Sequence, residues 1–109
     1  MNNVLTALVP ALLLVAGPAL AADDAAIVKK AKEVCAACHG PDGSTPSGPD
    51  FPKLGGQHAD YLLHSLKAYK SGARKDPIMA AQVQALTASE MEGLAAYYAR
   101  QPGTLVTKR

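Results

Sequence analysis

The apolar positions of this chain fall into three helical patterns, separated by segments rich in polar residues, glycine and proline. A first helix is predicted from about residue 24 to residue 38, where apolar and small side chains recur at helical spacing. A second helix is predicted over residues 59–71. A third is predicted over about residues 88–100, because Thr87 and Glu90 have the spacing of a capping box.

Each predicted helix carries one stripe of side chains that would face a core. No segment shows the alternation of a half-buried strand, so the predicted fold class is all-α, with helices around a single small core. The members of the three stripes, in chain order, are Ile27, Ala31, Val34 and Cys35; Leu62, Leu63, Leu66 and Tyr69; and Met91, Leu94, Ala95 and Tyr98.

Two connecting segments show neither helical periodicity nor the alternation of a strand. Residues 40–56 contain five glycines and four prolines, a composition that excludes a regular helix or a central strand. Residues 73–86 are predicted to form a second loop, in which Met79 follows Pro77. The expected order is helix, Gly/Pro-rich loop, helix, Met-bearing loop, helix.

The N-terminal segment has the pattern of an export signal. An apolar run over residues 4–15 is followed by Ala-Leu-Ala at 19–21, a small-x-small cleavage site. The run is too short for a comfortable membrane span. No Lys or Arg precedes it, so either the charged part of the signal is weak or the true start lies upstream. We expect residues 1–21 to be a signal peptide, residues 22–109 to be one domain in the periplasm, and membrane attachment only if the signal stays uncleaved.

The chemistry of the chain is concentrated in Cys-Ala-Ala-Cys-His at residues 35–39, which holds both cysteines of the sequence. Haem has two vinyl groups that form thioethers with cysteine and an iron that binds an axial base. A C-x-x-C-H segment presents two sulfurs and one imidazole from a single short stretch. The motif therefore predicts one covalent haem c, held by Cys35 and Cys38, with His39 as an iron ligand.

Three further roles for the same two cysteines fit the sequence less well. A structural zinc site needs four ligands, and only His58 and His64 remain as candidates, with no second cysteine pair. A thiol oxidoreductase of the thioredoxin kind would place Cys35 after a strand, and no β-rich run precedes it. A plain disulfide across so short a loop would stabilise the fold little.

Composition agrees with a buried cofactor. The chain has no Trp and one Phe, so a core made only of its own side chains would be marginal. A porphyrin would supply the missing apolar bulk.

The sixth iron position has four candidate ligands: Met79, Met91, His58 and His64. Met91 lies on the stripe of the third helix and is interpreted as a core residue. His64 is expected at the surface and His58 near a helix start, which leaves bis-histidine ligation as the minor alternative. Met79 lies forty residues beyond His39, far enough for the chain to reach the opposite haem face. Thioether ligation would raise the reduction potential relative to bis-histidine ligation, and it would close the position where peroxide or oxygen binds.

These residues resemble the class I cytochrome c family, specifically its small bacterial periplasmic members with one haem. The resemblance covers nearly all of the chain after the predicted signal. It rests on four segments: Cys-Ala-Ala-Cys-His-Gly at 35–40, Ser-Gly-Pro-Asp-Phe-Pro-Lys-Leu at 47–54, Gly-Gly-Gln-His-Ala-Asp-Tyr at 55–61 and Leu-Ala-Ala-Tyr-Tyr at 94–98.

The resemblance implies site residues and a packing arrangement. Cys35 and Cys38 would carry the thioethers, His39 would be the proximal ligand and Met79 the distal one. Pro49 is matched to the family's proline whose carbonyl accepts a hydrogen bond from the proximal imidazole. The first and last helices are expected to cross, with Ala31 packed against Ala95 or Tyr98.

Charge and ligation together suggest a function. The net charge of +2, from eleven basic and nine acidic residues, is too mild for nucleic-acid binding. We expect a monomeric one-electron carrier between redox proteins, with a terminal oxidase or another reductase as the acceptor, and no enzymatic activity. The alternatives are a haem protein with a labile sixth ligand, acting as a peroxidase or gas sensor, and a C-x-x-C thiol oxidoreductase. Basic residues near the second helix form either a solvated face or a rim that attracts an acidic partner: Lys53, Lys67, Lys70, Arg74 and Lys75.

Overall fold

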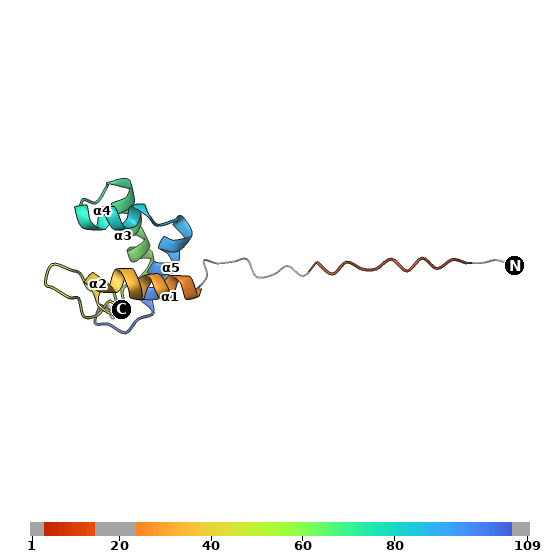
Figure 1. Cartoon of the computed structure of the whole chain (residues 1–109), viewed down its shortest axis with the longest axis horizontal. Coiled ribbons are helices and arrows are strands. Elements are labelled where there is room, and N and C mark those ends of the chain that lie inside the picture. The colour runs from red at the N-terminus through yellow and green to blue at the C-terminus, as the bar shows by residue number, and fades with distance from the viewer. Residues whose placement is uncertain (1–3, 15–23, 106–109) are drawn as a thin grey trace.

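The computed structural model describes residues 4–14 and 24–105. Within these residues the chain forms helices and no strand, so the predicted all-α class is confirmed (Figure 1). The elements, in chain order, are α1 (Asp24–Lys30), the π-helical turn η1 (Ala31–Cys35), α2 (Ala36–His39), α3 (Ala59–Ser71), α4 (Pro77–Gln84) and α5 (Ala88–Ala99).

The first three elements form one uninterrupted helix, as predicted. The junction residues Lys30, Cys35 and Ala36 all keep right-handed helical backbone angles. The helix ends after His39 at Gly40, whose φ of 86° is in the region that favours glycine. A Cβ on Gly40 would overlap the carbonyl oxygen of Thr45, so the loop folds back closely against the helix end.

The apolar stripe of this first helix differs from the prediction at one position. Ile27 and Ala31 are buried, but Val34 is 51% exposed, and the next partly buried position is Cys35. An α-helix turns about 100° per residue, which would have kept Val34 close to the buried face. The π turn over 31–35 is wider than an α turn, which accounts for the exposure of Val34, whereas Cys35 stays partly buried as predicted.

Helix α5 is the centre of the packing. It contacts both α1 and α3, and α4 packs on α3 (Figure 1). Met91 is buried on α5, as predicted for a core residue. The capping box at the start of α5 is present, since the Thr87 hydroxyl accepts from the Glu90 N–H and the Glu90 carboxylate accepts from the Thr87 N–H. The core consists of Ile27, Ala31, Leu62, Val83, Leu86, Met91, Leu94, Ala95, Tyr97 and Tyr98.

The expected crossing of the first and last helices is present. The Tyr98 hydroxyl donates to the Ala31 carbonyl across the crossing, over 3.5 Å. The helices approach closely at Gly93, where a Cβ would stand 2.8 Å from both Cγ1 and Cδ1 of Ile27. Glycine therefore permits the two helices to come this near.

The segment at 73–86 was predicted as a loop, and this prediction is wrong. Pro77–Gln84 forms helix α4, which contains Met79. The Asp76 carboxylate caps its start by accepting hydrogen bonds from the backbone N–H groups of Ile78 and Met79. Proline at the first helical position leaves no backbone donor unpaired there.

The predicted export signal is only partly within the described residues. Residues 4–14 form neither helix nor strand, and their side chains are exposed. The expected cleavage site at 19–21 lies outside the described residues. Among the helices of residues 24–105, none has the length and apolar character needed to cross a membrane.

The Gly93 contact predicts that Gly93→Ala destabilises the native protein but stabilises a variant in which Ile27 is shortened. In the native background, Gly93→Ala should lower the free energy of unfolding, because overpacking a tight contact costs about 1–3 kcal/mol and exceeds the gain of about 1 kcal/mol in helix propensity. In an Ile27→Ala background the clash is absent, and the same substitution should stabilise the protein. Denaturant unfolding of the four proteins measures both effects. Equal stabilisation in both backgrounds would contradict the close contact.

Glu90 links α5 to α1 through an ion pair with Lys30. The Lys30 ammonium, more than any other group, holds the pKa of Glu90 below its usual value. Because the folded pKa is the lower one, the contribution of the pair to stability is complete above the unfolded pKa of about 4.3. It is lost as the pH falls through the folded pKa.

Glu90→Gln should therefore reduce the free energy of unfolding at neutral pH by less than about 1 kcal/mol, since the pair is partly solvated. Glutamine keeps the capping box, so the substitution removes mainly the charge. Urea unfolding at pH ~7 and pH ~3 measures the difference, which should be smaller at the lower pH. A difference of the same size at both pH values would refute the electrostatic origin.

Candidate haem-binding site

Cys35, Cys38 and His39 lie at the C-terminal end of the first helix. Cys35 is the last residue of η1, and the other two belong to α2. Both cysteines are free thiols and half-buried. Residues three and four positions apart share one side of a helix, so these three side chains are brought together by the helix itself. The structure therefore groups the three residues of the C-x-x-C-H motif at one end of the helix.

His39 has the environment of an axial ligand. Its side chain is 6% exposed, and its Nδ1 lies 2.8 Å from the carbonyl oxygen of Pro52. A neutral imidazole that donates from Nδ1 keeps its lone pair on Nε2. Across residues 24–105, no protein group forms a hydrogen bond with Nε2. The ring is thus oriented by one nitrogen and available for a metal through the other, the arrangement typical of metal-binding histidines.

The carbonyl that holds the ring belongs to Pro52, whereas the resemblance had matched Pro49 to this role. Pro49 is exposed. The loop explains the difference: the Ser47 N–H donates to the Cys38 carbonyl over 3.0 Å, which anchors the first half of the loop beside the helix end. A turn then follows, closed by the Phe51 N–H on the Gly48 carbonyl, and brings Pro52 back toward His39. The loop therefore reaches the imidazole of His39 at Pro52, three residues after Pro49.

Met79 lies on a different element from His39. It is half-buried on α4 and packs against the core. Helices α4 and α2 are separated in Figure 1, with α4 packed on α3. A methionine from a separate element is what ligation from the opposite side of a flat group requires.

The other histidines fit the roles expected of them. His64 is exposed on α3, as predicted for a surface residue. His58 is exposed at the N-cap position of α3, and its side chain makes no capping hydrogen bond. Neither residue is buried in the way that His39 is.

Burial changes the acidity of two groups beside the motif. Desolvation raises the pKa of the Cys35 thiol, and the neighbouring Tyr98 hydroxyl and Lys30 ammonium only partly oppose this effect. Desolvation likewise raises the pKa of Tyr98 well above its usual value. The thiol at Cys35 is therefore protonated at neutral pH. A redox-active dithiol needs the reverse, a thiolate favoured by a lowered pKa.

Sequence reasoning missed the contributions of Pro52 and of the Tyr98 hydroxyl. Pro52 lies in the Phe-Pro-Lys-Leu segment already quoted for the resemblance, so its spacing from His39 could have been tested against that of Pro49. Tyr98 was placed on the core stripe, but no sequence signal indicates where its hydroxyl points.

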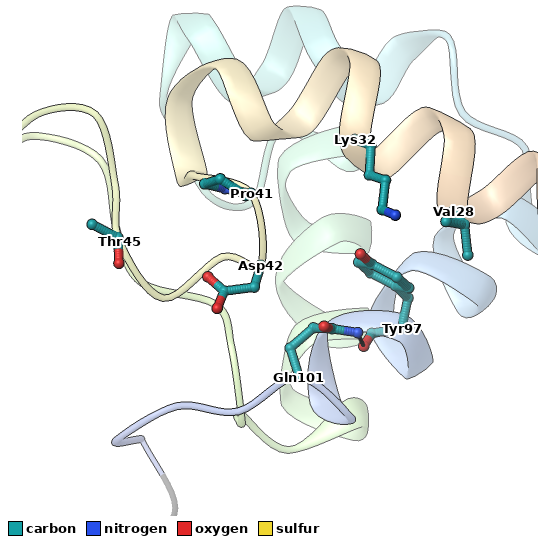
Figure 2. A pocket seen from close by; sticks show the side chains of 7 residues that line it. All are labelled: Val28, Lys32, Pro41, Asp42, Thr45, Tyr97 and Gln101. Atoms are coloured by element: carbon teal, nitrogen blue, oxygen red, sulfur yellow. Dashed lines mark hydrogen bonds between the residues drawn. The ribbon is translucent and has the colours of Figure 1, made fainter.

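A separate groove lies beside the first helix, between it and the end of α5. It has a volume of about 720 Å³ and contains none of the predicted haem-binding residues (Figure 2). It is lined by Val28, Lys32, Pro41, Asp42, Thr45, Tyr97 and Gln101. This groove is therefore not the candidate haem site.

Comparison with known proteins decides the family. Residues 25–99 match the family model for cytochrome c. The chain belongs to the cytochrome c family. This membership implies a covalently bound haem c, and the single C-x-x-C-H of the chain fits one haem.

Cytochrome c4 of Stutzerimonas stutzeri is 39% identical over 114 residues, which cover 96% of this chain and 53% of that protein. Cytochrome c-554(548) of Halomonas halodenitrificans is 41% identical over 83 residues, covering 73% of this chain and 99% of that protein. The crystal structure of reduced recombinant cytochrome c4 from Pseudomonas stutzeri superposes with a TM-score of 0.61 at 30% identity, covering 72% of this chain and 48% of that one. The chain spans about half the length of the cytochrome c4 relatives it matches.

The contact between His39 and Pro52 can be tested with a matched pair of prolines in the haem-loaded protein. Pro52→Ala should loosen the carbonyl from Nδ1, reduce the electron donation of the imidazole and raise the reduction potential. Pro49→Ala should leave the potential unchanged. Both substitutions alter the entropy of the unfolded chain in the same way, so a potentiometric titration separates the contact from general loop effects. A shift of the same size in Pro49→Ala would exclude the role given to Pro52.

Proposed function

We propose that this cytochrome c domain carries single electrons between redox proteins, with one haem attached through Cys35 and Cys38 and its iron bound by His39 and Met79. The observation that carries the proposal is the buried His39 ring, anchored through Nδ1 and open at Nε2, directly beside two free thiols. When bound, the haem supplies a ferric/ferrous couple that exchanges one electron.

Residues of this chain are candidate ligands for both faces of a bound haem. The helix end presents both sulfurs and Nε2 of His39, and the Pro52 carbonyl keeps the ring from rotating. On the other side, the Met79 thioether of α4 would bind the iron. Asp76 holds the first turn of α4 through its hydrogen bonds to the backbone of Ile78 and Met79. A thioether favours ferrous over ferric iron and leaves no open position for peroxide or oxygen. The domain is therefore proposed to act as a carrier and not as an enzyme.

A thiol oxidoreductase fits the buried environment of Cys35 poorly. Its attacking cysteine would need a lowered pKa, whereas burial raises the pKa of Cys35. A peroxidase or gas sensor would need a sixth position that opens easily. The competing functions therefore depend on whether Met79 binds the iron.

Redox proteins with acidic surfaces are the proposed partners, and electron-transfer encounters of this kind are small and transient. The basic rim predicted from the sequence is only partly free to meet them. The Lys70 ammonium donates to the Leu86 carbonyl, and the Arg74 guanidinium lies 4.8 Å from the centre of the Tyr69 ring. Lys53, Lys67 and Lys75 are at least partly exposed and remain as the candidate contacts.

Export to the periplasm is also proposed, with residues 1–21 as the signal and residues 22–109 as the exported domain. It is supported by the apolar run at 4–15, and covalent haem attachment is consistent with export.

The ligand role of Met79 is tested by a matched pair of methionine substitutions. Met79→Leu should lower the reduction potential and let the reduced iron bind carbon monoxide. Met91→Leu should change neither property, because Met91 is a core residue on α5 and the substitution conserves volume. Absorption spectra, potentiometry and the intact mass of protein exported with the haem-maturation machinery measure these effects. The mass also reports haem addition and signal cleavage.

A Met79→Leu variant with the native potential and no carbon monoxide binding would exclude Met79 as the ligand. A native protein whose mass includes no haem would exclude the proposed function.

A further inference from the structure

Helix α4 is anchored at its C-terminal end and lightly packed at its start, where Met79 lies. Val83, in the last turn, is the one buried residue of this helix and is 0% exposed. Beyond it, Leu86 is also buried, and the Leu86 carbonyl accepts a hydrogen bond from the Lys70 ammonium of α3. The Gln84 side-chain amide donates to the Lys70 carbonyl over 3.4 Å. These contacts fix the second half of α4 on α3.

The first turn of α4 has little packing of this kind. Pro77 is exposed, Ile78 is 56% exposed, and Met79 is only partly buried against the core. The first four backbone N–H groups of a helix have no carbonyl partner within the helix. The direction of this turn therefore depends on the groups that bind those N–H groups.

Asp76 binds the turn at three successive positions. One carboxylate oxygen, Oδ1, accepts from the backbone N–H of Ile78 over 2.9 Å and from that of Met79 over 3.0 Å. The Asp76 carbonyl accepts from the Ala80 N–H over 2.8 Å. Pro77, the first residue of the helix, has no N–H to satisfy. The backbone of Met79 is thus bonded directly to the carboxylate of Asp76.

A ligand that is already held in its bound direction binds more tightly, because it loses less conformational freedom on binding. We propose that the Asp76 carboxylate is a positioning group for Met79: by fixing the first turn of α4, it keeps the thioether directed toward the iron and opposes its displacement by competing ligands. Loss of the cap would free the turn that carries Met79, while Val83 and Leu86 still hold the rest of the segment on the core. The inference rests on the proposed ligation of iron by Met79.

The test compares three variants of the haem-loaded protein. Asp76→Ala removes the acceptor, whereas Asp76→Asn removes the charge and keeps an oxygen that caps a helix equally well. Thr87→Ala is the matched control, because the Thr87 hydroxyl caps α5 by accepting from the Glu90 N–H over 3.1 Å, and α5 carries no proposed iron ligand. Titration of the ferric protein with imidazole measures how easily the thioether is displaced. Hydrogen exchange at the Ile78 and Met79 amides reports the cap without reference to the iron.

Asp76→Ala should raise the apparent affinity for imidazole about fivefold, the equivalent of the ~1 kcal/mol that an N-cap typically contributes. Exchange at the Ile78 and Met79 amides should accelerate in this variant, while the amides of α3 keep their native protection. Asp76→Asn should restore the native imidazole affinity and the native exchange. Thr87→Ala should lower the free energy of unfolding by a similar amount and leave the imidazole affinity unchanged.

Native imidazole affinity in Asp76→Ala would overturn the proposal, as would an equal rise in Thr87→Ala, because general stability would then control the ligand. An equal rise in Asp76→Asn would also overturn it, since the charge and not the hydrogen bonds would be responsible. A loss of protection in Asp76→Ala that extends through α3 would do the same.

Met79→Leu separates this failure from a failure of the proposed function. If Met79→Leu binds imidazole more tightly than the native protein and Asp76→Ala does not, only the role of Asp76 is wrong. If Met79→Leu keeps the native affinity, Met79 is not the iron ligand, and the proposed ligation fails together with the inference.

Discussion

The hydrogen bond between His39 and the Pro52 carbonyl is the constraint on which the rest of the candidate site depends. A buried imidazole is useful to an iron only if one ring nitrogen is oriented and the other left open. Here the orienting group comes from a long Gly/Pro-rich loop, and that loop must return to the helix end to deliver it. The close approach at Gly40 and the anchoring of Ser47 on the helix carbonyls serve this return.

The packing of the helices also positions the residues of the candidate site. Helix α5 crosses the first helix at Gly93, holds the packed face in place, and brings the Tyr98 hydroxyl to the π turn. The same helix continues to Cys35 and ends at His39. Met79 lies on a different helix, α4, which packs on α3. In the proposed site, the nitrogen donor His39 and the sulfur donor Met79 would therefore come from two different helices.

Sequence patterns predicted much of this arrangement, and the failures have physical causes. Periodicity located α3 and α5 because their stripes are long and their ends carry clear signals, Gly72 for one and the Thr87–Glu90 capping box for the other. It missed α4, which is short, but Asp76 followed by Pro77 is a helix start that could have been recognised. It placed Val34 on the buried face because a regular period cannot anticipate a π turn. The identity of the proline that contacts His39 depends on the path of the loop, which spacing does not encode.

The central claim is that iron in this domain is bound between the imidazole of His39 and the thioether of Met79. X-ray absorption at the iron edge of the haem-loaded protein tests it most directly, because sulfur and nitrogen scatter differently at the short distances of a first coordination shell. Ligation by His39 and Met79 predicts one sulfur ligand and five nitrogen ligands in both oxidation states. A shell of six nitrogens, or of five ligands without sulfur, would contradict it.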